Sequence, residues 1–462
     1  MKKFDWISFA IVISLIIIGL MMIYAAGYQP DSETPFFSTQ AGKQSIFASV
    51  GILILTACQL IDWKFWSGFA YPFYAFTIFL LLLVLVMGAT IKGSTSWFQL
   101  GWFSFQPSEL AKVGTIMALS SFLSHHRTRM SDNRDLMMAS GIILLPALLV
   151  LLQGDAGSAL VFLSIFLVLF REGLAIWIPI LILILAMLFV IALKYDVFVV
   201  LPLLLYAGSI FLLINLRRKQ SHVLVSTAFI VAGLGFAFMQ RLDFVIAVSV
   251  GYMLYATVEN FLSKQIRQVV LLSLGVTMLF GFAYISSYLF TNVLEPHQQD
   301  RINVWLNPEN CDPRGSLYNI LQSKIAIGSG GFSGKGYLQG TMTKLNYVPE
   351  QSTDFIYSII GEEHGFIGSV AVIMLFLILM LRTIDIGERA RIPFIRHYAF
   401  GVVGIVFTHF MVNIGMTMGL MPVIGIPLPF ISSGGSSMLG FSLMIGILLS
   451  MDSSWVRSRR YV

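Results

Sequence analysis

The chain has few charged residues and almost no cysteine. Asp, Glu, Lys and Arg make up 11% of its 462 residues, whereas hydrophobic residues make up 57%. A soluble domain carries about 25% charged residues, so this composition excludes a soluble protein. The two cysteines, Cys58 and Cys311, cannot build a disulfide framework or a cysteine metal site. The net charge of +6 indicates basic loops beside a membrane and not nucleic-acid binding.

Long apolar runs take the place of the missing charge. Many of them approach the roughly 20 residues that a membrane-spanning helix needs, and segments of alternating polarity, as in membrane β-barrels, are absent. We therefore predict an all-α, polytopic membrane protein with about 10–14 transmembrane helices. The first run, from about Trp6, is too long for a signal peptide and is expected to be retained. The candidate spans lie near residues 6–26, 45–62, 67–88, 107–124, 136–153, 156–170, 175–194, 198–216, 223–239, 244–261, 268–290, 364–383, 397–418 and 430–450.

Basic residues concentrate in alternate connections between these spans. They are Arg127, Arg129, Arg134, Arg217, Arg218, Lys219, Lys264, Arg267, Arg382, Arg389, Arg391, Arg396, Arg457, Arg459 and Arg460. Because an excess of Lys and Arg marks cytoplasmic loops, we expect both termini in the cytoplasm. The prediction divides the chain into three parts. A transmembrane bundle covers 1–290, with extra spans within 195–290, a large extracytoplasmic loop covers 291–363, and helices with a basic cytoplasmic tail cover 364–462.

The long polar segment from Asn292 to Glu363 is the first place to look for chemistry, because long loops on rigid scaffolds are often functional. Apolar residues recur at helical spacing from Leu317 to Ile327, which predicts a short amphipathic helix ending near Gly328. The glycines that follow would let the backbone approach a ligand closely. The alternative interpretation is a flexible surface loop.

Asp354 is the strongest candidate for a catalytic group in this segment. It precedes an apolar stretch where the chain re-enters the membrane, and a carboxylate in partly dehydrated surroundings suits a general base. Glu350 would share a face with it if the stretch is helical. Glu362 and Glu363 follow. Alternatively, these acids are paired with the basic residues of the loop, which are Lys335, Lys344 and Arg301.

A second cluster lies near the start of the span at 107–124. Pro107 suits the first turn of a helix, and Glu109 and Lys112 would then project from one side of it. Charged residues inside a span face a cavity or each other, so the two form either a buried ion pair or part of a substrate site. Trp97, just before, is either an interfacial anchor or a substrate contact.

Other polar residues have simpler interpretations. Asp155 is expected to cap the helix that follows it. His409 and Asn413, four residues apart on one span, are expected to form interhelical hydrogen bonds. The segment 421–430 is predicted to be a non-helical turn, and the small residues from Ser432 to Ser436 then begin the last span.

The order of these motifs resembles the SEDS family of bacterial membrane glycosyltransferases (shape, elongation, division and sporulation proteins). The matching segments run from one end of the chain to the other. They are Ser96–Phe98, Gln106–Lys112, Gln153–Gly157, Gln322–Gly331, Pro349–Phe355, Gly361–Gly365 and Asn413–Met416 through Gly434-Gly435. The segments 327–336 and 339–345 are more similar to the elongation subfamily than to the division subfamily.

The resemblance implies a peptidoglycan glycosyltransferase that polymerises lipid II into glycan strands at the outer face of the bacterial cytoplasmic membrane, with inversion at the anomeric carbon. It assigns the essential acid to Asp354 and the intramembrane pair to Glu109 and Lys112. The implied partners are a class B penicillin-binding protein and other elongation-complex membrane proteins. The alternatives are a lipid II flippase, a scaffold for the transpeptidase, and a division- or sporulation-type member of the family.

A leaving pyrophosphate needs positive charge nearby. Lys324, Lys335 and Lys344 are available in the loop and Lys112 in the membrane, and a divalent cation, Mg²⁺ or Mn²⁺, is the alternative source. The chain departs from the family pattern at Lys43, where an arginine is usual, and in its extra spans. Lysine binds phosphate as a point charge, without the bidentate geometry of arginine.

Overall fold

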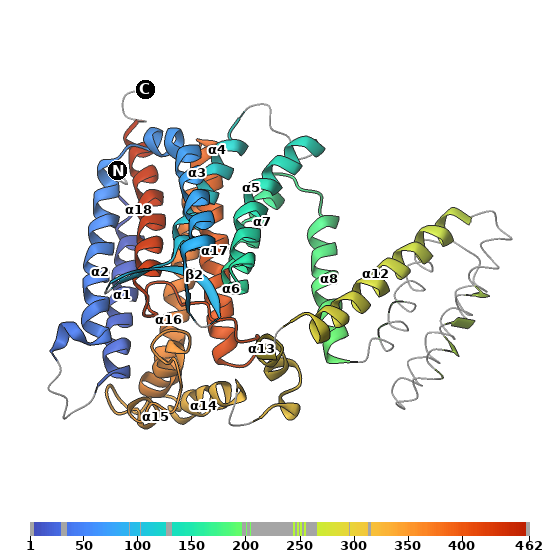
Figure 1. The fold of residues 1–462 in the computed structure, drawn as a ribbon. Helices are drawn as coiled ribbons and strands as arrows, with labels where there is room; N and C mark the ends of the chain where they lie inside the picture. The colour runs from blue at the N-terminus through green and yellow to red at the C-terminus, as the bar shows by residue number, and fades with distance from the viewer. Residues whose placement is uncertain are drawn as a thin grey trace. The chain divides into compact units, whose positions relative to one another are not determined.

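The computed structural model describes residues 4–28, 35–91, 93–101, 103–125, 132–195, 266–294, 296–312 and 316–458, and residues 200, 204, 244, 247–248, 250–251 and 254–255 between them. The longer elements are α1 (Trp6–Ala26), α2 (Gln40–Ala57), α3 (Trp63–Met87), β1 (Ala89–Ile91), β2 (Ser94–Leu100), β3 (Phe103–Phe105), α4 (Pro107–Leu123), α5 (Asn133–Leu152), α6 (Ala156–Leu163), α7 (Phe166–Arg171), α8 (Trp177–Lys194), α12 (Ile266–Asn292), α13 (Pro296–Leu306), α14 (Ser316–Ser329), α15 (Thr341–Lys344), α16 (Ile356–Arg389), α17 (Pro393–Thr417) and α18 (Gly435–Ser458) (Figure 1). Three short 3₁₀ helices are η1 (Phe36–Ser38), η2 (Cys58–Leu60) and η3 (Pro308–Asn310).

The described residues contain nine helices that are long and apolar enough to cross a membrane. This confirms the prediction of an all-α, polytopic membrane protein. The helices agree with the predicted spans wherever the two can be compared, and α4 and the short pair α6 and α7 correspond to the predicted spans at 107–124 and 156–170. The predicted spans at 198–216, 223–239 and 244–261 fall almost entirely outside the described residues.

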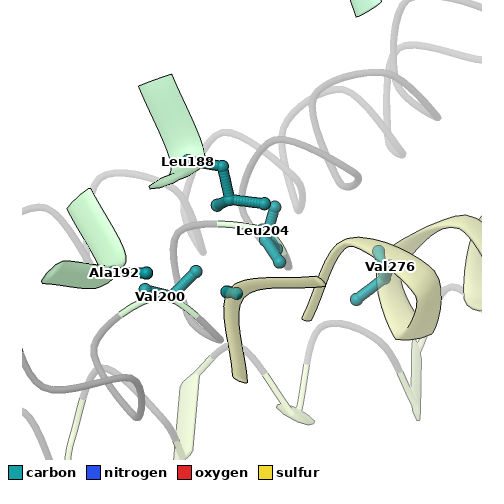
Figure 2. Packing of buried hydrophobic residues seen from close by; sticks show 6 residues of the cluster. Leu188, Ala192, Val200, Leu204 and Val276 are labelled. Atoms are coloured by element: carbon teal, nitrogen blue, oxygen red, sulfur yellow. The ribbon is translucent and has the colours of Figure 1, made fainter. Parts of the chain in front are cut away.

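The chain forms two compact units, residues 1–175 together with 312–462, and residues 176–311. In the second unit, α8 and α12 pack through a small apolar core, whose residues Figure 2 shows in close-up. It consists of Leu188, Ala192, Val200, Leu204, Val276 and Ala283. The predicted boundaries at residues 290 and 363 separate membrane segments from an extracytoplasmic loop, whereas the two units are separated by packing. The predicted boundaries stay a prediction.

Helix α4 forms the centre of the first unit. It packs against α3, α5, α17 and α18, and nearly all of its side chains are buried. Its sequence is rich in Ala, Ser, Thr and Gly, which let neighbouring helices approach closely. Gly401 of α17 illustrates this, because a methyl group there would lie 2.5 Å from Ile116 of α4. The central helix therefore carries Glu109 and Lys112 away from solvent.

The charged ends of helices meet at one end of the first unit, where α1 begins and α18 ends (Figure 1). Arg382 of α16 donates to Asp5, the N-cap of α1, at 2.8 Å, and Arg389 donates to Asp452 of α18 at 2.7 Å. Burial alone would raise the pKa of Asp5, but the hydrogen bonds from Arg382 and Ser8 outweigh it, so this pKa lies below its usual value. The start of α1, the end of α16 and the later part of α18, which are predicted to lie toward the cytoplasm, thus share one end of this unit.

A three-stranded antiparallel sheet, β1-β2-β3, precedes α4 and was not predicted. The strands are short, and Gly93 and Gly101, both with positive φ, lie in the turns between them. In this stretch the apolar residues do not alternate clearly with polar ones, so the pattern is too weak to predict strands. The hydrogen bond from Thr95 N–H to the Gln153 carbonyl, 2.9 Å, attaches β2 to the end of α5.

Helix α16 begins eight residues before the predicted span and breaks at Gly365, where φ is 60° and ψ is −154°. The break frees backbone groups on both sides of it. The Glu362 and Glu363 carbonyls accept N–H groups of Lys335 and Gly336 at 3.0 and 2.9 Å, and the Phe366 N–H donates to the Gly331 carbonyl at 2.9 Å. The glycine-rich loop therefore approaches α16 closely, and the predicted approach of its backbone to a ligand stays a prediction.

Two neighbouring glycines test this close packing. A Cβ at Gly330 would overlap the Gly361 carbonyl, whereas a Cβ at Gly328 would meet no atom within 4 Å. We predict that Gly330→Ala lowers the free energy of unfolding by about 1–3 kcal/mol, as overpacking does. Thermal melting in detergent measures the change. Gly328→Ala is the control and should not lower stability, so equal losses in both variants would contradict the packing.

Candidate active site

Three consecutive backbone carbonyls hold Asp354 in place. They belong to residues 352–354, and each accepts a hydrogen bond from α17 or from the connection between α17 and α18. The first accepts the N–H of Ser433 at 2.9 Å, the second the hydroxyl of Ser432 at 2.6 Å, and the third the side-chain amide of Asn413 at 3.0 Å. The turn that carries Asp354 is thus fixed to the last two helices of the chain.

The connection between α17 and α18 also touches the carboxylate itself. Gly425 has a φ of 75°, in the left-handed region that favours glycine. A methyl group on it would lie 3.3 Å from Oδ2 of Asp354. The same Asn413 amide that holds the Asp354 carbonyl donates to the Ile426 carbonyl at 2.8 Å. The Asn413 side chain therefore bonds both to the turn that carries Asp354 and to the connection that carries Gly425.

A series of hydrogen-bonded buried side chains supports the connection between α17 and α18. Lys112 donates to Glu109 at 2.8 Å, and its Nζ lies 3.0 Å from Nε2 of His409. Nδ1 of His409 lies 2.8 Å from the Pro427 carbonyl. A carbonyl accepts and an ammonium donates, so His409 is the neutral tautomer with its proton on Nδ1. The predicted interhelical bonding is confirmed for His409, which reaches Lys112 of α4, whereas Asn413 bonds to the carbonyls of Asp354 and Ile426, which lie outside the helices.

Glu109 and Lys112 are a buried ion pair. Lys112 is fully buried and Glu109 is 3% exposed. Removing two charges from water is costly unless they are paired and hydrogen-bonded, and here the pair and His409 meet that need. Phe441 lies beside them, its ring centroid 5.4 Å from the Lys112 ammonium. The structure thus brings the predicted pair together, through His409 and Pro427, with the frame around Asp354.

Glu350 does not share a helical face with Asp354. Residues 349–354 form a turn in which Glu350 has a φ of 54°. Its carbonyl accepts the N–H groups of residues 353–355 at 3.1 to 3.3 Å. Its side chain is exposed and accepts the Thr353 hydroxyl at 3.2 Å. Glu350 thus shapes the turn through its backbone. The sequence did not predict this, because residues with a positive φ are usually glycine.

Glu362 anchors the glycine-rich loop and α15. Its carboxylate is fully buried and accepts Lys335 at 2.6 Å, the N–H groups of Met342 and Thr343 at 2.9 Å, and the Thr343 hydroxyl at 2.7 Å. The alternative that a loop acid pairs with a loop lysine is therefore correct for Glu362 and Lys335. The neighbouring Glu363 is also buried.

The remaining loop lysines differ in their surroundings. Lys324 lies against Gly419, just beyond the C-terminal end of α17, and a methyl group on Gly419 would sit 2.5 Å from its Nζ. A cation at this end of a helix is favourable. Ser323 donates to the Thr417 carbonyl at 2.9 Å and holds α14 there. Lys344 is exposed and forms no ion pair within 4 Å among the described residues.

Two further predicted residues lie at the edge of this region. Trp97 is half-buried on β2, opposite Ala89 of β1. Asp155 caps α6 by accepting the Ser158 N–H at 2.9 Å, as predicted, and it also accepts the side chain of Gln106 at 2.9 Å. The backbone of Gln106 in turn donates to Ser436 at 3.0 Å, so the end of the small sheet reaches the start of α18.

The part of the chain that the structure describes contains no group of three or more His, Cys, Asp or Glu side chains placed to hold a metal ion. The divalent cation considered as an alternative source of positive charge beside the pyrophosphate stays a prediction.

The sequence profile of the FtsW, RodA and SpoVE family, described as cell cycle proteins, matches residues 5–203 and 198–455. The chain belongs to this family. RodA of Treponema pallidum, a peptidoglycan glycosyltransferase, is 34% identical to it over 458 residues, 98% of each chain. Among solved structures, a chain of a peptidoglycan synthase complex has 25% identity, 99% coverage of both chains and a TM-score of 0.63. The rod-shape-determining protein RodA of Thermus thermophilus has 22% identity, covers 98% of this chain and 97% of its own, and has a TM-score of 0.56.

For this FtsW/RodA/SpoVE family member, the role of Glu362 is testable. Hydrogen bonds to a charged acceptor contribute about 1.5–3 kcal/mol, more than those to a neutral one. We predict that Glu362→Gln loosens α15, so that the Met342 and Thr343 amides exchange with deuterium at least about tenfold faster, the equivalent of 1.4 kcal/mol. The control is Glu388→Gln, at an exposed carboxylate paired with Arg171. Unchanged exchange in Glu362→Gln would contradict the anchoring role.

Proposed function

We propose that this chain is a peptidoglycan glycosyltransferase that polymerises lipid II at the outer face of the bacterial cytoplasmic membrane. The observation that carries the proposal is the frame around Asp354. A carboxylate on a turn whose three backbone carbonyls are all hydrogen-bonded, at the end of a membrane bundle, is positioned to act on a lipid-linked substrate. The family membership and the glycosyltransferase name of the 34% identical relative support the reaction class.

The orientation follows from charge. The segments rich in arginine share one end of the first unit, and the Asp354 frame occupies connections at the other end of the same helices. Because basic loops stay in the cytoplasm, both termini are cytoplasmic and Asp354 faces outward. The lipid tails of the substrate would lie among the helices, and its sugars would meet at the outer surface.

The reaction requires a base on the attacking side. The 4-hydroxyl oxygen of one lipid-linked sugar attacks C1 of another, the C1–O bond to pyrophosphate breaks, and the hydroxyl proton passes to the Asp354 carboxylate. A single displacement through an oxocarbenium-like transition state inverts the anomeric centre. General base catalysis of this kind accelerates a reaction about 10²–10⁴-fold.

The leaving pyrophosphate carries the negative charge that develops. Lys344 is exposed and near the site in sequence, whereas Lys335 is shared with Glu362 and Lys112 with Glu109 and His409. Lys324 lies at the end of α17. Trp97, on β2, is retained as a substrate contact at the edge of the site. Cell elongation, in partnership with a class B penicillin-binding protein and other elongation-complex membrane proteins, is the biological role we propose.

A carboxamide at position 354 tests the mechanism. Asp354→Asn keeps the shape of the side chain but cannot accept the proton. We predict that lipid II polymerisation by the purified protein in detergent falls at least about 100-fold, the low end of a general-base contribution. Gel analysis of the glycan product measures this.

The control makes the same change at Asp312, an exposed residue of the same loop, and should retain full activity. A flippase or a scaffold would make no polymer even as the wild-type protein. Wild-type polymerisation by a folded Asp354→Asn variant would remove Asp354 from the mechanism.

A further inference from the structure

The first turn of α18 carries backbone donors without acceptors. The N–H groups of residues 435–437 have no partner within the helix, whose first bond runs from Met438 N–H to the Gly434 carbonyl at 3.0 Å. No acceptor among the described residues bonds to these three groups. Gly434, directly before the helix, has no side chain that could cap them, and residues 433–435 are half-exposed.

Gln44 of α2 adds an independent sign of a missing acceptor. Its side chain is 3% exposed, and its Oε1 accepts the Gly434 N–H at 3.1 Å. Because Oε1 of Gln44 accepts the Gly434 N–H, the Nε2 of the same amide group also lies beside the start of α18. That nitrogen, Nε2, is buried and has no hydrogen-bond partner among the described residues. An unsatisfied buried amide costs about 1–3 kcal/mol, which an acceptor supplied by a ligand would recover.

Ser433 links these donors to Asp354. Its hydroxyl accepts Nε2 of Gln40 at 3.1 Å, which leaves the hydroxyl proton available to donate. Its backbone N–H donates to the Ser352 carbonyl, two residues before Asp354. We call the three N–H groups of residues 435–437, the Gln44 amide and the Ser433 hydroxyl the α18 donor cluster. Every member donates, so the cluster suits an anion with several oxygens.

We propose that the α18 donor cluster binds the phosphates of a polyprenyl pyrophosphate. This inference rests on the proposed glycosyltransferase function, because it names the site of that reaction's leaving group. The N-terminus of a long helix carries roughly half a positive charge, and its N–H groups point at a bound phosphate. As the C1–O bond breaks, charge grows on the phosphate oxygen, so donors fixed in advance stabilise the transition state more than the ground state.

The position of the α18 donor cluster places the proposed phosphate site close to the proposed base, Asp354. The carbonyls of residues 352 and 353 accept hydrogen bonds from Ser433 and Ser432, and α18 begins two residues after Ser433. The base and the phosphate donors are therefore fixed on the same short connection. Lys335 and Lys112 are already paired, so the helix adds donors that these two lysines do not supply.

Binding of inorganic pyrophosphate to the purified full-length chain in detergent, measured by calorimetry at low ionic strength, tests the proposal. Gln44→Glu replaces the unpaired donor by a carboxylate, and we predict that it raises Kd at least about tenfold, since loss of a hydrogen bond to a charged group costs at least 1.4 kcal/mol. Gly434→Ala is the second variant. Its methyl group would meet only Ser437 Cβ, at 3.5 Å, so it keeps the fold while crowding the turn, and Kd should rise about fivefold or more, as for about 1 kcal/mol of lost binding.

The matched control is Gln59→Glu. Gln59 donates to the carbonyl of Gly446, which lies in α18 about three turns beyond the donor cluster. Its Kd should equal that of the wild type. The proposal would be overturned if pyrophosphate did not bind to the wild-type protein, or if Gln44→Glu and Gly434→Ala both bound it with the wild-type Kd. If Gln44→Glu does not melt cooperatively, Gly434→Ala alone decides.

The Asp354→Asn variant separates this proposal from the proposed function. It should bind pyrophosphate as the wild type does while making no polymer. Loss of polymerisation in Asp354→Asn together with an unchanged Kd in the Gln44 and Gly434 variants overturns the phosphate site alone. Normal polymerisation by Asp354→Asn overturns the assigned base, whatever the binding result.

Discussion

The hydrogen bonds to the carbonyls of residues 352–354 are the constraint on which the rest of the site depends. A turn outside regular secondary structure has no ladder of its own to hold it, so its backbone groups must find partners elsewhere. Here the partners are Ser433, Ser432 and Asn413. They place Asp354 relative to α17 and α18, although these partners lie more than fifty residues away from it in sequence. A rigid pair of helices thereby determines where the carboxylate lies.

The buried polar residues extend this constraint into the bundle. Glu109 and Lys112 lie on α4, the most enclosed helix of the unit, and His409 carries their interaction to the Pro427 carbonyl. Each member has a partner, so burying them is tolerated, and removing any one would leave a charge or a polar group unsatisfied. The pair thus supports the connection between α17 and α18 through His409.

The sequence predicted much of the fold, because apolar runs of spanning length are a strong signal. It also predicted the amphipathic helix α14, the cap at Asp155 and the interhelical bonding of His409, which depend on local spacing. It could not predict the left-handed conformation of Glu350 or the role of the glycine-rich loop. Both depend on partners distant in sequence, as does the assignment of Lys335 to Glu362.

The most direct test of the central claim, that the Asp354 carboxylate is the base, is chemical rescue. Asp354→Ala removes the base and leaves space for a small carboxylate, so added formate can accept the proton in its place. The account predicts negligible lipid II polymerisation by this variant in buffer and a rate that rises with formate concentration. The wild-type protein should not respond to formate. Polymerisation by Asp354→Ala at the wild-type rate in buffer, or a folded variant that formate never restores, would contradict the account.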